Sequence, residues 1–168
     1  DTYNDVWYST DGISWILATQ HASWSPRGQI IGGVVFDGKM WVIGGGTYNA
    51  PRQYYNDVWN STDGVNWTRV MSNAPWEPRQ YHNTTVFDNK IWVLGGYHDT
   101  NLGDVWYSSD GMNWYQLLNP PWLPRHASSV FVHENALWMA AGSIIGNTPV
   151  NDVWRMRKTL ALSIMPPA

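Results

Sequence analysis

Cysteine is absent from the 168-residue sequence, which excludes disulfides, thiolate nucleophiles and metal sites built on cysteine. Charged residues make up only 14% of the chain, and the formal net charge is −3. No stripe of Lys and Arg is present to neutralise phosphates, so we expect no nucleic-acid partner. No apolar run approaches the roughly 18 residues of a membrane span, so we expect no membrane insertion. A polar, uncharged and aromatic-rich surface favours a secreted, periplasmic or cell-surface location over a cytoplasmic one.

Tryptophan, in contrast, is abundant, and the 13 tryptophans all fall on four positions of one repeat. The repeat is roughly 48 residues long, and its units begin at Asn4, Asn56, Gly103 and Asn151. Trp is the last residue of the motif Asn/Gly-Asp-Val-Trp (Trp7, Trp59, Trp106, Trp154) and of the motif Ser-x-Asp-Gly-x-x-Trp (Trp15, Trp67, Trp114). It is the first residue of the motif Trp-x-Pro-Arg (Trp24, Trp76, Trp122), and it also occurs once in an apolar run of each unit (Trp41, Trp92, Trp138). A residue that recurs in every unit is most simply part of the core of that unit.

The complete unit that begins at Asn56 predicts strands at residues 56–60, 65–71, 83–87 and 90–94. Turn residues 62–64 and 88–89 separate the strands within each pair, and a proline-containing loop joins the two pairs. We expect Gly95-Gly96 to end the last strand. Four antiparallel strands in each unit, without helical periodicity, are typical of a β-propeller blade.

The sequence therefore predicts an all-β chain of about three and a half four-stranded antiparallel blades. Residues 1–158 form the propeller segment, and residues 159–168 form a C-terminal tail in which 159–164 could supply a further strand. Closed propellers usually have about four to eight blades. We therefore expect either part of a longer propeller or half of a ring assembled from two copies, which would make the complete protein a homodimer.

The repeat resembles that of the kelch family, whose blades carry a diglycine, a spaced aromatic–Trp pair and an Arg before the next first strand. The matching residues are Gly44-Gly45 and Gly95-Gly96, the pairs Tyr8/Trp15 and Tyr107/Trp114, and Arg27, Arg79 and Arg125. The chain departs from the pattern at Asn60, in place of the aromatic, and at Ala141-Gly142, in place of the third diglycine. The Ser-x-Asp-Gly-x-x-Trp turn also resembles a shortened Asp box of sialidase-type propellers. The resemblance implies a kelch-type propeller.

The repeated arginines permit two interpretations. Arg27, Arg79 and Arg125 could tie the blades together through bonds to carbonyls or to a neighbouring Asp, or they could form a ring of positive charge that attracts a carboxylate ligand. Trp24, Trp76 and Trp122 lie beside them in sequence, so these tryptophans are candidate ligand contacts as well as candidate core residues.

Loops that vary between units are the second group of candidates. Because consecutive strands alternate in direction, the second-to-third and fourth-to-first connections should share one face of the propeller. The long connections at 46–55, 97–102 and 143–150 all belong to this face. Variable loops on a constant scaffold often bind ligands, and aromatic and polar side chains there suit a sugar or a peptide. The candidate residues in these loops are Arg52, Tyr54, Tyr55, Tyr97 and His98.

Catalysis has little support in the sequence. No zinc-binding His spacing occurs, so we expect no metal and no cofactor, and we assign no catalytic residue. Glu77 and Asp99 could form a carboxylate pair only if their loops converge. The galactose oxidase branch of the kelch family uses copper with a Cys-crosslinked Tyr, which this chain cannot build, whereas the sialic acid mutarotase branch needs no metal.

The leading hypothesis is a noncatalytic module that binds a protein or a glycan. The alternatives are a carbohydrate-active enzyme, such as a sugar mutarotase or epimerase-like propeller, and a structural module that assembles through open blade edges.

Overall fold

The computed structural model describes residues 2–28 and 33–158, which form β-strands and one short 3-10 turn. The predicted strand at 159–164 lies outside the described residues. The elements are β1 (Val6–Tyr8), β2 (Ile16–Thr19), β3 (Val34–Phe36), β4 (Lys39–Gly46), β5 (Tyr54–Ser61), β6 (Thr68–Met71), β7 (Asn83–Phe87), β8 (Lys90–His98), β9 (Thr100–Ser108), β10 (Tyr115–Leu117), β11 (Ser129–His133), β12 (Ala136–Ala140), β13 (Ser143–Ile144), η1 (Ile145–Asn147), β14 (Thr148–Pro149) and β15 (Val153–Arg157).

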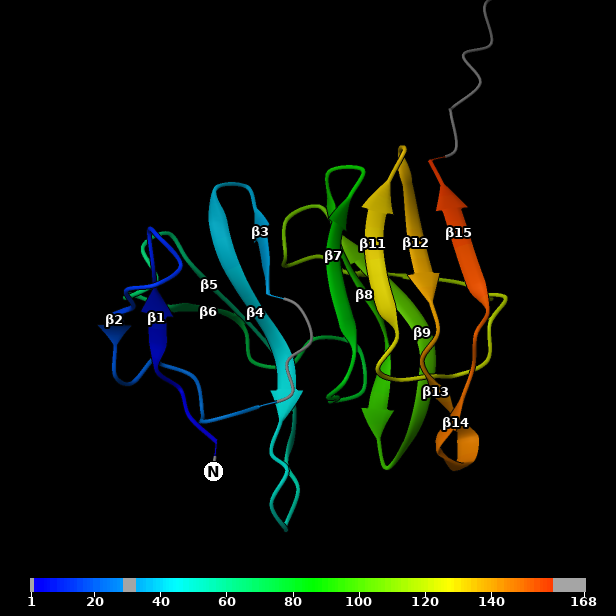
Figure 1. Cartoon of the computed structure of the whole chain (residues 1–168), viewed down its shortest axis with the longest axis horizontal. Helices are drawn as coiled ribbons and strands as arrows, with labels where there is room; N and C mark the ends of the chain where they lie inside the picture. Colours follow the sequence, from blue (N-terminus) through cyan, green and yellow to red (C-terminus); the bar gives the residue numbers. More distant parts are fainter. Residues whose placement is uncertain (1, 29–32, 159–168) are drawn as a thin grey trace, which may run out of the picture.

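Apart from the short β13–β14 hairpin, the strands of the described residues form four antiparallel sheets that follow one another along the chain (Figure 1). Sheet 1 contains β1 and β2; sheet 2 contains β3 to β6; sheet 3 contains β7 to β10; and sheet 4 contains β11, β12 and β15. The short β13–β14 hairpin lies between β12 and β15 in sequence. Two complete four-stranded sheets between two partial ones confirm the predicted all-β fold of four-stranded antiparallel sheets.

The hairpin between the first two strands of sheet 3 forms as predicted. β7 spans the predicted residues, and β8 begins at Lys90. Asp88 and Asn89 both have positive φ, 50° and 53°, as a tight turn that matches the twist of an antiparallel hairpin requires. The Trp92 indole N–H spans the hairpin end and donates to the Phe87 carbonyl at 2.9 Å.

The diglycines do not end the strands that contain them, so that prediction is wrong. β8 continues to His98, and its register with β9 shifts between Leu94 and Gly96. Positive φ at Gly95 and Gly96, 56° and 117°, makes a bulge instead of a strand end. A Cβ on Gly95 would lie 2.6 Å from the Arg125 carbonyl oxygen, so glycine here permits close approach of the connection that carries the repeated Arg.

The Ser-x-Asp-Gly turns are held by their own side chains. In sheet 2, Asp63 Oδ1 accepts from the backbone N–H groups of Val65 and Asn66, each at 2.8 Å. Ser61 Oγ accepts from the Gly64 N–H at 2.8 Å. Because this turn uses the residues up to Trp67, β6 begins at Thr68 and not at Val65 as the sequence suggested.

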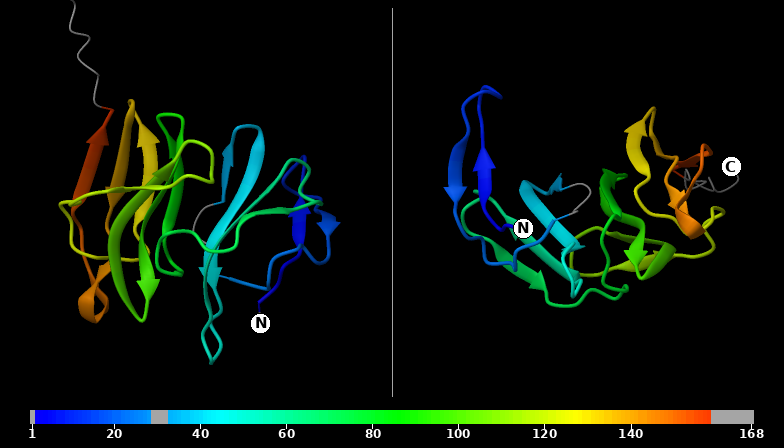
Figure 2. Two further views of the ribbon diagram at one scale, coloured as in Figure 1. Left: turned by 180° about the vertical axis from the view of Figure 1, so that it is seen from behind. Right: turned by 60° about the horizontal axis from the view of Figure 1, so that its bottom comes forward.

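Figure 2 shows the four sheets along an arc, and the hydrophobic cores lie between successive sheets. On the inner side β7 contacts both β3 and β11. The core between sheets 2 and 3 contains Trp41, Val58, Trp76 and Trp114. Trp41, Trp76 and Trp114 are therefore core residues, as their recurrence suggested, and this core lies between two sheets, whereas Trp7 and Trp15 of sheet 1 are exposed.

The Trp-x-Pro-Arg segments join neighbouring sheets. In the first of them, the Asn4 side chain of sheet 1 donates to the Ala22 and Trp24 carbonyls, each at 3.0 Å. The Trp24 ring packs edge-on against Trp59 and Trp67 of sheet 2, with centroid distances of 6.4 and 4.3 Å. The Trp76 ring packs edge-on against Trp114 of sheet 3 and at a tilt against Trp106. The Trp122 ring packs at a tilt against Trp154 of sheet 4.

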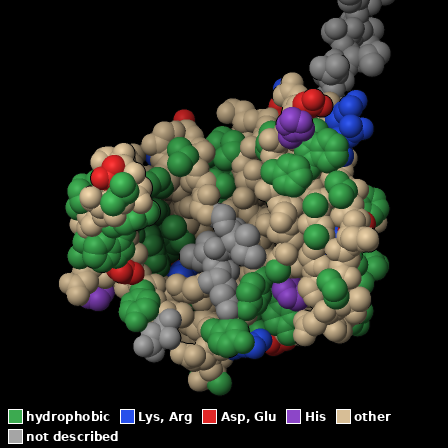
Figure 3. All heavy atoms as spheres, in the orientation of Figure 1, with side chains coloured by type: hydrophobic (Ala, Val, Ile, Leu, Met, Phe, Trp, Pro, Cys, Tyr) green, Lys and Arg blue, Asp and Glu red, His purple; other side chains and the backbone are tan. Residues whose placement is uncertain are grey.

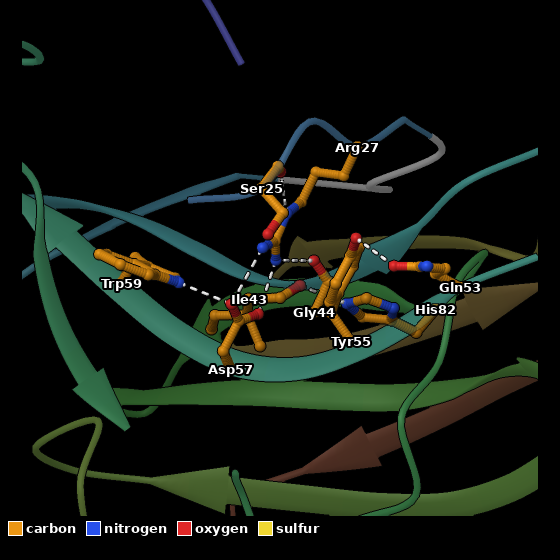
Figure 4. Close-up of polar contacts among 9 residues, drawn as sticks. All are labelled: Ser25, Arg27, Ile43, Gly44, Gln53, Tyr55, Asp57, Trp59 and His82. Atoms are coloured by element: carbon orange, nitrogen blue, oxygen red, sulfur yellow. Dashed lines mark hydrogen bonds and ion pairs between the residues drawn. The ribbon is translucent and has the colours of Figure 1, made fainter. Parts of the chain in front are cut away.

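Each of these segments ends in an Arg that binds an Asp of the following sheet (Figure 4). Arg27 donates to both oxygens of Asp57, at 2.6 and 2.9 Å, and to the Gly44 carbonyl at 3.0 Å. The Trp59 indole N–H donates to Asp57 Oδ2 at 2.7 Å and fixes the carboxylate from the other side. The pairs Arg79–Asp104 and Arg125–Asp152 repeat this arrangement, with Trp106 and Trp154 as the indole donors.

The attraction between the opposite charges of each ion pair is only weakly screened, because the guanidinium groups are buried away from water. The three arginines are 6%, 0% and 2% exposed, in chain order. The hydrogen bonds from Arg125, followed by those from Trp154, hold the pKa of Asp152 down at about 2. All three repeated arginines therefore tie neighbouring sheets together, because their N–H groups donate to Asp side chains and backbone carbonyls.

We predict that Asp104→Asn lowers the free energy of unfolding by about 3 kcal/mol or more, because it leaves the buried Arg79 cation without its counter-charge. The matched control is Asp88→Asn, which removes the partly exposed ion pairs of Asp88 with Lys90 and Lys158 and should cost less than about 1 kcal/mol. Urea unfolding followed by tryptophan fluorescence measures both losses. Similar losses in the two variants would contradict the structural role of the buried pair.

Candidate functional site

The second-to-third and fourth-to-first connections share one face, at the bottom of Figure 1. We call this the loop face. Isolated bridges join the two kinds of connection at equivalent positions of the repeat: Gly28 with Gly46, Gln80 with Tyr97, and His126 with Ser143. In each unit the residue after the repeated Arg is thus held against the residue after the diglycine position. The residue type differs from unit to unit at these positions, although the backbone pairing repeats.

Six of the predicted ligand contacts belong to the scaffold beneath the loop face. Arg27, Arg79 and Arg125 are buried in the ion pairs described above. Trp24 and Trp76 are buried, and Trp122 is half-buried against the next sheet. We therefore assign these side chains to packing and look for a ligand surface among the loop residues.

Tyr55 and Tyr97 lie apart. Tyr55 packs beneath the guanidinium of Arg27, with 4.1 Å from the Arg27 Cζ atom to the ring centroid, and its hydroxyl donates to Gln53 Oε1 at 3.1 Å. Tyr97 lies in β8 of the next sheet, and its ring centroid is 5.4 Å from that of His126. Tyr55 thus supports an ion pair, whereas Tyr97 faces a cleft described below.

The structure brings Arg52, Tyr54 and His98 together with Asp99 and Glu77; we call these five residues the polar cluster. The Tyr54 hydroxyl donates to Asp99 Oδ1 at 3.0 Å, and its ring lies 4.4 Å from that of His98. A side-chain hydrogen bond with Tyr54 raises the pKa of Arg52 above its ordinary value. His98 Nδ1 lies 2.7 Å from Glu77 Oε1.

The loops that carry Glu77 and Asp99 therefore converge, but the two carboxylates do not form a pair. Glu77 contacts His98, and Asp99 contacts Tyr54. A carboxylate beside an imidazole on an accessible surface can accept and return a proton, which is the chemistry of a general acid–base pair. The Glu77 side chain is 57% exposed, whereas the His98 side chain is 27% exposed and its Nδ1 atom is buried.

A cleft of about 600 Å³ opens beside the polar cluster, and Asp99 belongs to both. The β8–β9 hairpin forms one wall, with Tyr97, Asp99 and Asn101. Leu123 and Pro124, from the connection before β11, and the β13–η1 segment form the others. The cleft thus combines an aromatic ring, a carboxylate and an amide with aliphatic walls.

The polar groups of the cleft are held in place by neighbours. His126 Nδ1 lies 2.6 Å from Asn101 Oδ1, and Asn101 Nδ2 donates to the Ser143 carbonyl at 3.2 Å. Burial lowers the pKa of His126, so the imidazole is neutral at pH 7. Because Asn101 Nδ2 is the donor to Ser143, its Oδ1 accepts the N–H of His126. Asn101 is therefore oriented before any ligand arrives.

The sequence did not single out Asn101, His126, Leu123 or the two isoleucines of 144–145. Their only sequence signal is that they are unrepeated residues in or beside the long connections. The convergence of three connections on one cleft depends on the curvature of the arc, which the repeat spacing does not specify.

Within residues 2–28 and 33–158, no group of three or more His, Cys, Asp or Glu side chains is placed to hold a metal ion. Nor does this part of the chain contain a helix long and apolar enough to span a bilayer.

No protein-family model and no curated protein matches the chain. Among solved structures, the chain is similar to that of YjhT, a kelch-repeat protein and N-acetylneuraminate mutarotase, with a TM-score of 0.72 and 19% sequence identity. The match covers 91% of this chain and 57% of the YjhT chain, so this chain spans somewhat more than half of that protein. The likeness concerns the fold: the chain is all-β, and its antiparallel four-stranded sheets match part of a kelch propeller.

Proposed function

We propose that the protein is a noncatalytic binding module that holds a carbohydrate in the cleft of the loop face. The observation that carries the proposal is the cleft itself, about 600 Å³ in volume, where Tyr97, Asp99 and Asn101 face aliphatic walls. Binding sites for small ligands typically have volumes of about 300 to 1,000 Å³ and combine apolar walls with a few placed polar groups. A sugar ring presents an apolar face and a hydroxyl edge, which suit Tyr97 and Asp99 respectively.

Preorganisation supports this proposal. Tyr54 holds one oxygen of Asp99, and His126 with Ser143 holds Asn101, so hydroxyl groups of a ligand would meet acceptors and donors already in position. Fixing polar groups in advance reduces the entropy lost on binding. The sheets beneath, joined by buried ion pairs, keep the three walls at a constant separation.

A protein ligand is the alternative occupant of the same cleft. Ile145 is 85% exposed and Leu123 is 61% exposed at the rim, and exposed aliphatic side chains suit a polypeptide partner. The two occupants differ in their energetics: loss of the aliphatic rim should weaken a protein much more than a sugar.

We predict that Tyr97→Ala and Asp99→Asn each weaken carbohydrate binding at least tenfold, a loss of about 1.4 kcal/mol or more. Asp99 has a positive φ of 56°, which Asn tolerates, so this variant keeps the turn while it removes the charge. The measurement is a glycan array on the wild-type chain, followed by calorimetric titration with the best-bound glycan. Tyr115→Ala, which truncates an exposed Tyr of β10, is the control and should bind as the wild type does.

The proposal is contradicted if no glycan binds, or if the bound glycan is indifferent to both substitutions. A ligand that is a protein, and whose affinity falls with Ile145→Ser and Leu123→Ser but not with Asp99→Asn, would support the alternative occupant.

A sugar mutarotase is the second candidate function. The observation that favours it is the Glu77–His98 pair at 2.7 Å beside the cleft, together with the fold that the chain shares with YjhT. Interconversion of anomers needs proton transfer to and from the ring and anomeric oxygens, and a carboxylate–imidazole pair can supply it.

For that reaction, Glu77→Gln should lower the rate of anomer interconversion by about 100-fold or more, the usual scale of general acid–base catalysis. Proton NMR of freshly dissolved single anomers of N-acetylneuraminate, with chelator present, measures the rate. Glu134→Gln, in the β11–β12 turn at the opposite face, is the control. A wild-type rate equal to the uncatalysed rate, or one unchanged by Glu77→Gln, would remove the enzyme hypothesis.

A further inference from the structure

The connection between β4 and β5 extends far out on the loop face, at the bottom of Figure 1, and its own hydrogen bonds close its base. The Thr47 N–H donates to the Gln53 carbonyl at 2.9 Å, and the Gln53 N–H donates to Thr47 Oγ1 at 2.9 Å. The ladder between the two strands continues to the same point, where Gly46 pairs with Tyr54. Residues 48–52, which we call the tip, are therefore anchored on both sides.

The tip presents the ring of Tyr48, which is 61% exposed. The Arg52 Cζ atom lies 5.6 Å from the centroid of this ring, so a cation–π contact within the tip orients it. Figure 3 shows hydrophobic side chains, a class that includes Tyr there, beside basic and acidic ones at the lower edge of the molecule. An exposed aromatic ring that is already oriented offers a flat apolar face to a ligand at a low entropic cost.

A row of contacts joins the tip to the cleft. Asp99 lines the cleft, and its Oδ1 atom accepts from the Tyr54 hydroxyl at 3.0 Å. Because a hydroxyl has a single proton, this Tyr54 oxygen accepts its hydrogen bond from Arg52. That bond raises the pKa of Arg52, and weaker electrostatic interactions with Tyr97, a residue of the cleft, and with Tyr48 raise it further. The row therefore runs from the cleft through Tyr54 and Arg52 to Tyr48.

A single sugar ring in the cleft would leave the outer part of this row unused. The residues that line the cleft include Tyr97 and Asp99 but neither Arg52 nor Tyr48. Arg52 is exposed, and none of the ion pairs among residues 2–28 and 33–158 includes it. Its remaining N–H donors can therefore serve the hydroxyl oxygens of a ligand. The row has an aromatic ring at each end, with a donor and an acceptor between them.

We propose that the ligand is an oligosaccharide of two or more residues, with one ring against Tyr97 in the cleft and a later ring against Tyr48 at the tip. Hydroxyl groups between the two rings would bind Asp99 and Arg52. This inference rests on the proposed carbohydrate-binding function and adds to it a second subsite and a class of ligand, a sugar chain. Because both contacts are made by one molecule, the second is intramolecular, and affinity rises with chain length.

The test compares saccharides of increasing length. The probes are unbranched saccharides of one to four residues on a glycan array, and every member of the best-bound series is then titrated by calorimetry. We expect the longest members to bind the wild-type chain at least about tenfold more tightly than the monosaccharide. Tyr48→Ala should remove this gain and leave the Kd of the monosaccharide unchanged, whereas Tyr97→Ala should weaken the binding of every member.

Two further variants control for the chemistry and for the position. Tyr48→Phe keeps the ring and should keep the gain with chain length, which separates stacking from hydrogen bonding by the hydroxyl. Tyr115→Ala truncates another exposed Tyr, on β10, and should bind every member as the wild type does. An unchanged Kd of the monosaccharide for Tyr48→Ala shows that the cleft of this variant remains folded.

The outcomes separate the second subsite from the proposed function on which it rests. Equal affinities for all lengths, or a gain that survives Tyr48→Ala, would overturn the second subsite, while monosaccharide binding that depends on Tyr97 would still support the cleft. Failure of every saccharide to bind would overturn both. A protein ligand, bound in place of any saccharide and weakened by Tyr48→Ala, would also overturn both, because the tip would then contact a polypeptide.

Discussion

The buried Arg–Asp ion pair between a connecting segment and the next sheet is the interaction on which the rest of the structure depends. It occurs at Asp57, Asp104 and Asp152, always with an indole N–H on the far side of the carboxylate. Removal of a guanidinium from water costs several kcal/mol, which the chain offsets by giving each Arg two carboxylate oxygens and two backbone carbonyls. Because the same segment also carries the Trp that packs on the next sheet, one short motif sets the position of each sheet relative to the previous one.

Much of the fold could be predicted from the sequence because the repeat separates structural residues from the others. Recurring Asp and Trp residues were expected in turns and cores, and Asp63 and Trp41 occupy such places. The prediction that the diglycine ends its strand was wrong, because glycines with positive φ can either end a strand or form a bulge within it. The close approach of the Arg125 backbone, which the sequence does not show, favours the bulge. The contacts of Trp24 also needed the structure, since packing between sheets depends on the angle between them.

The candidate site was predictable only in part, for a similar reason. The sequence identified the loops and several of their residues, and the structure gathers Arg52, Tyr54 and His98. It did not identify Asn101 or His126, which matter because connections from neighbouring sheets meet there. The proposed binding residues are unrepeated side chains on a repeated backbone, so ligand specificity can vary while the ion pairs beneath stay the same.

The most direct test of this account is a double-mutant cycle on Arg79 and Asp104, with Arg79→Met, Asp104→Leu and the double variant compared by urea unfolding. Contacting residues in one network show interaction energies of about 0.5 to 3 kcal/mol. We predict a coupling energy of about 2 kcal/mol or more, because each single variant leaves a buried charge unpaired while the double variant does not. A coupling energy below about 0.5 kcal/mol would mean that the two side chains act independently, and would contradict the view that the pair positions one sheet on the next.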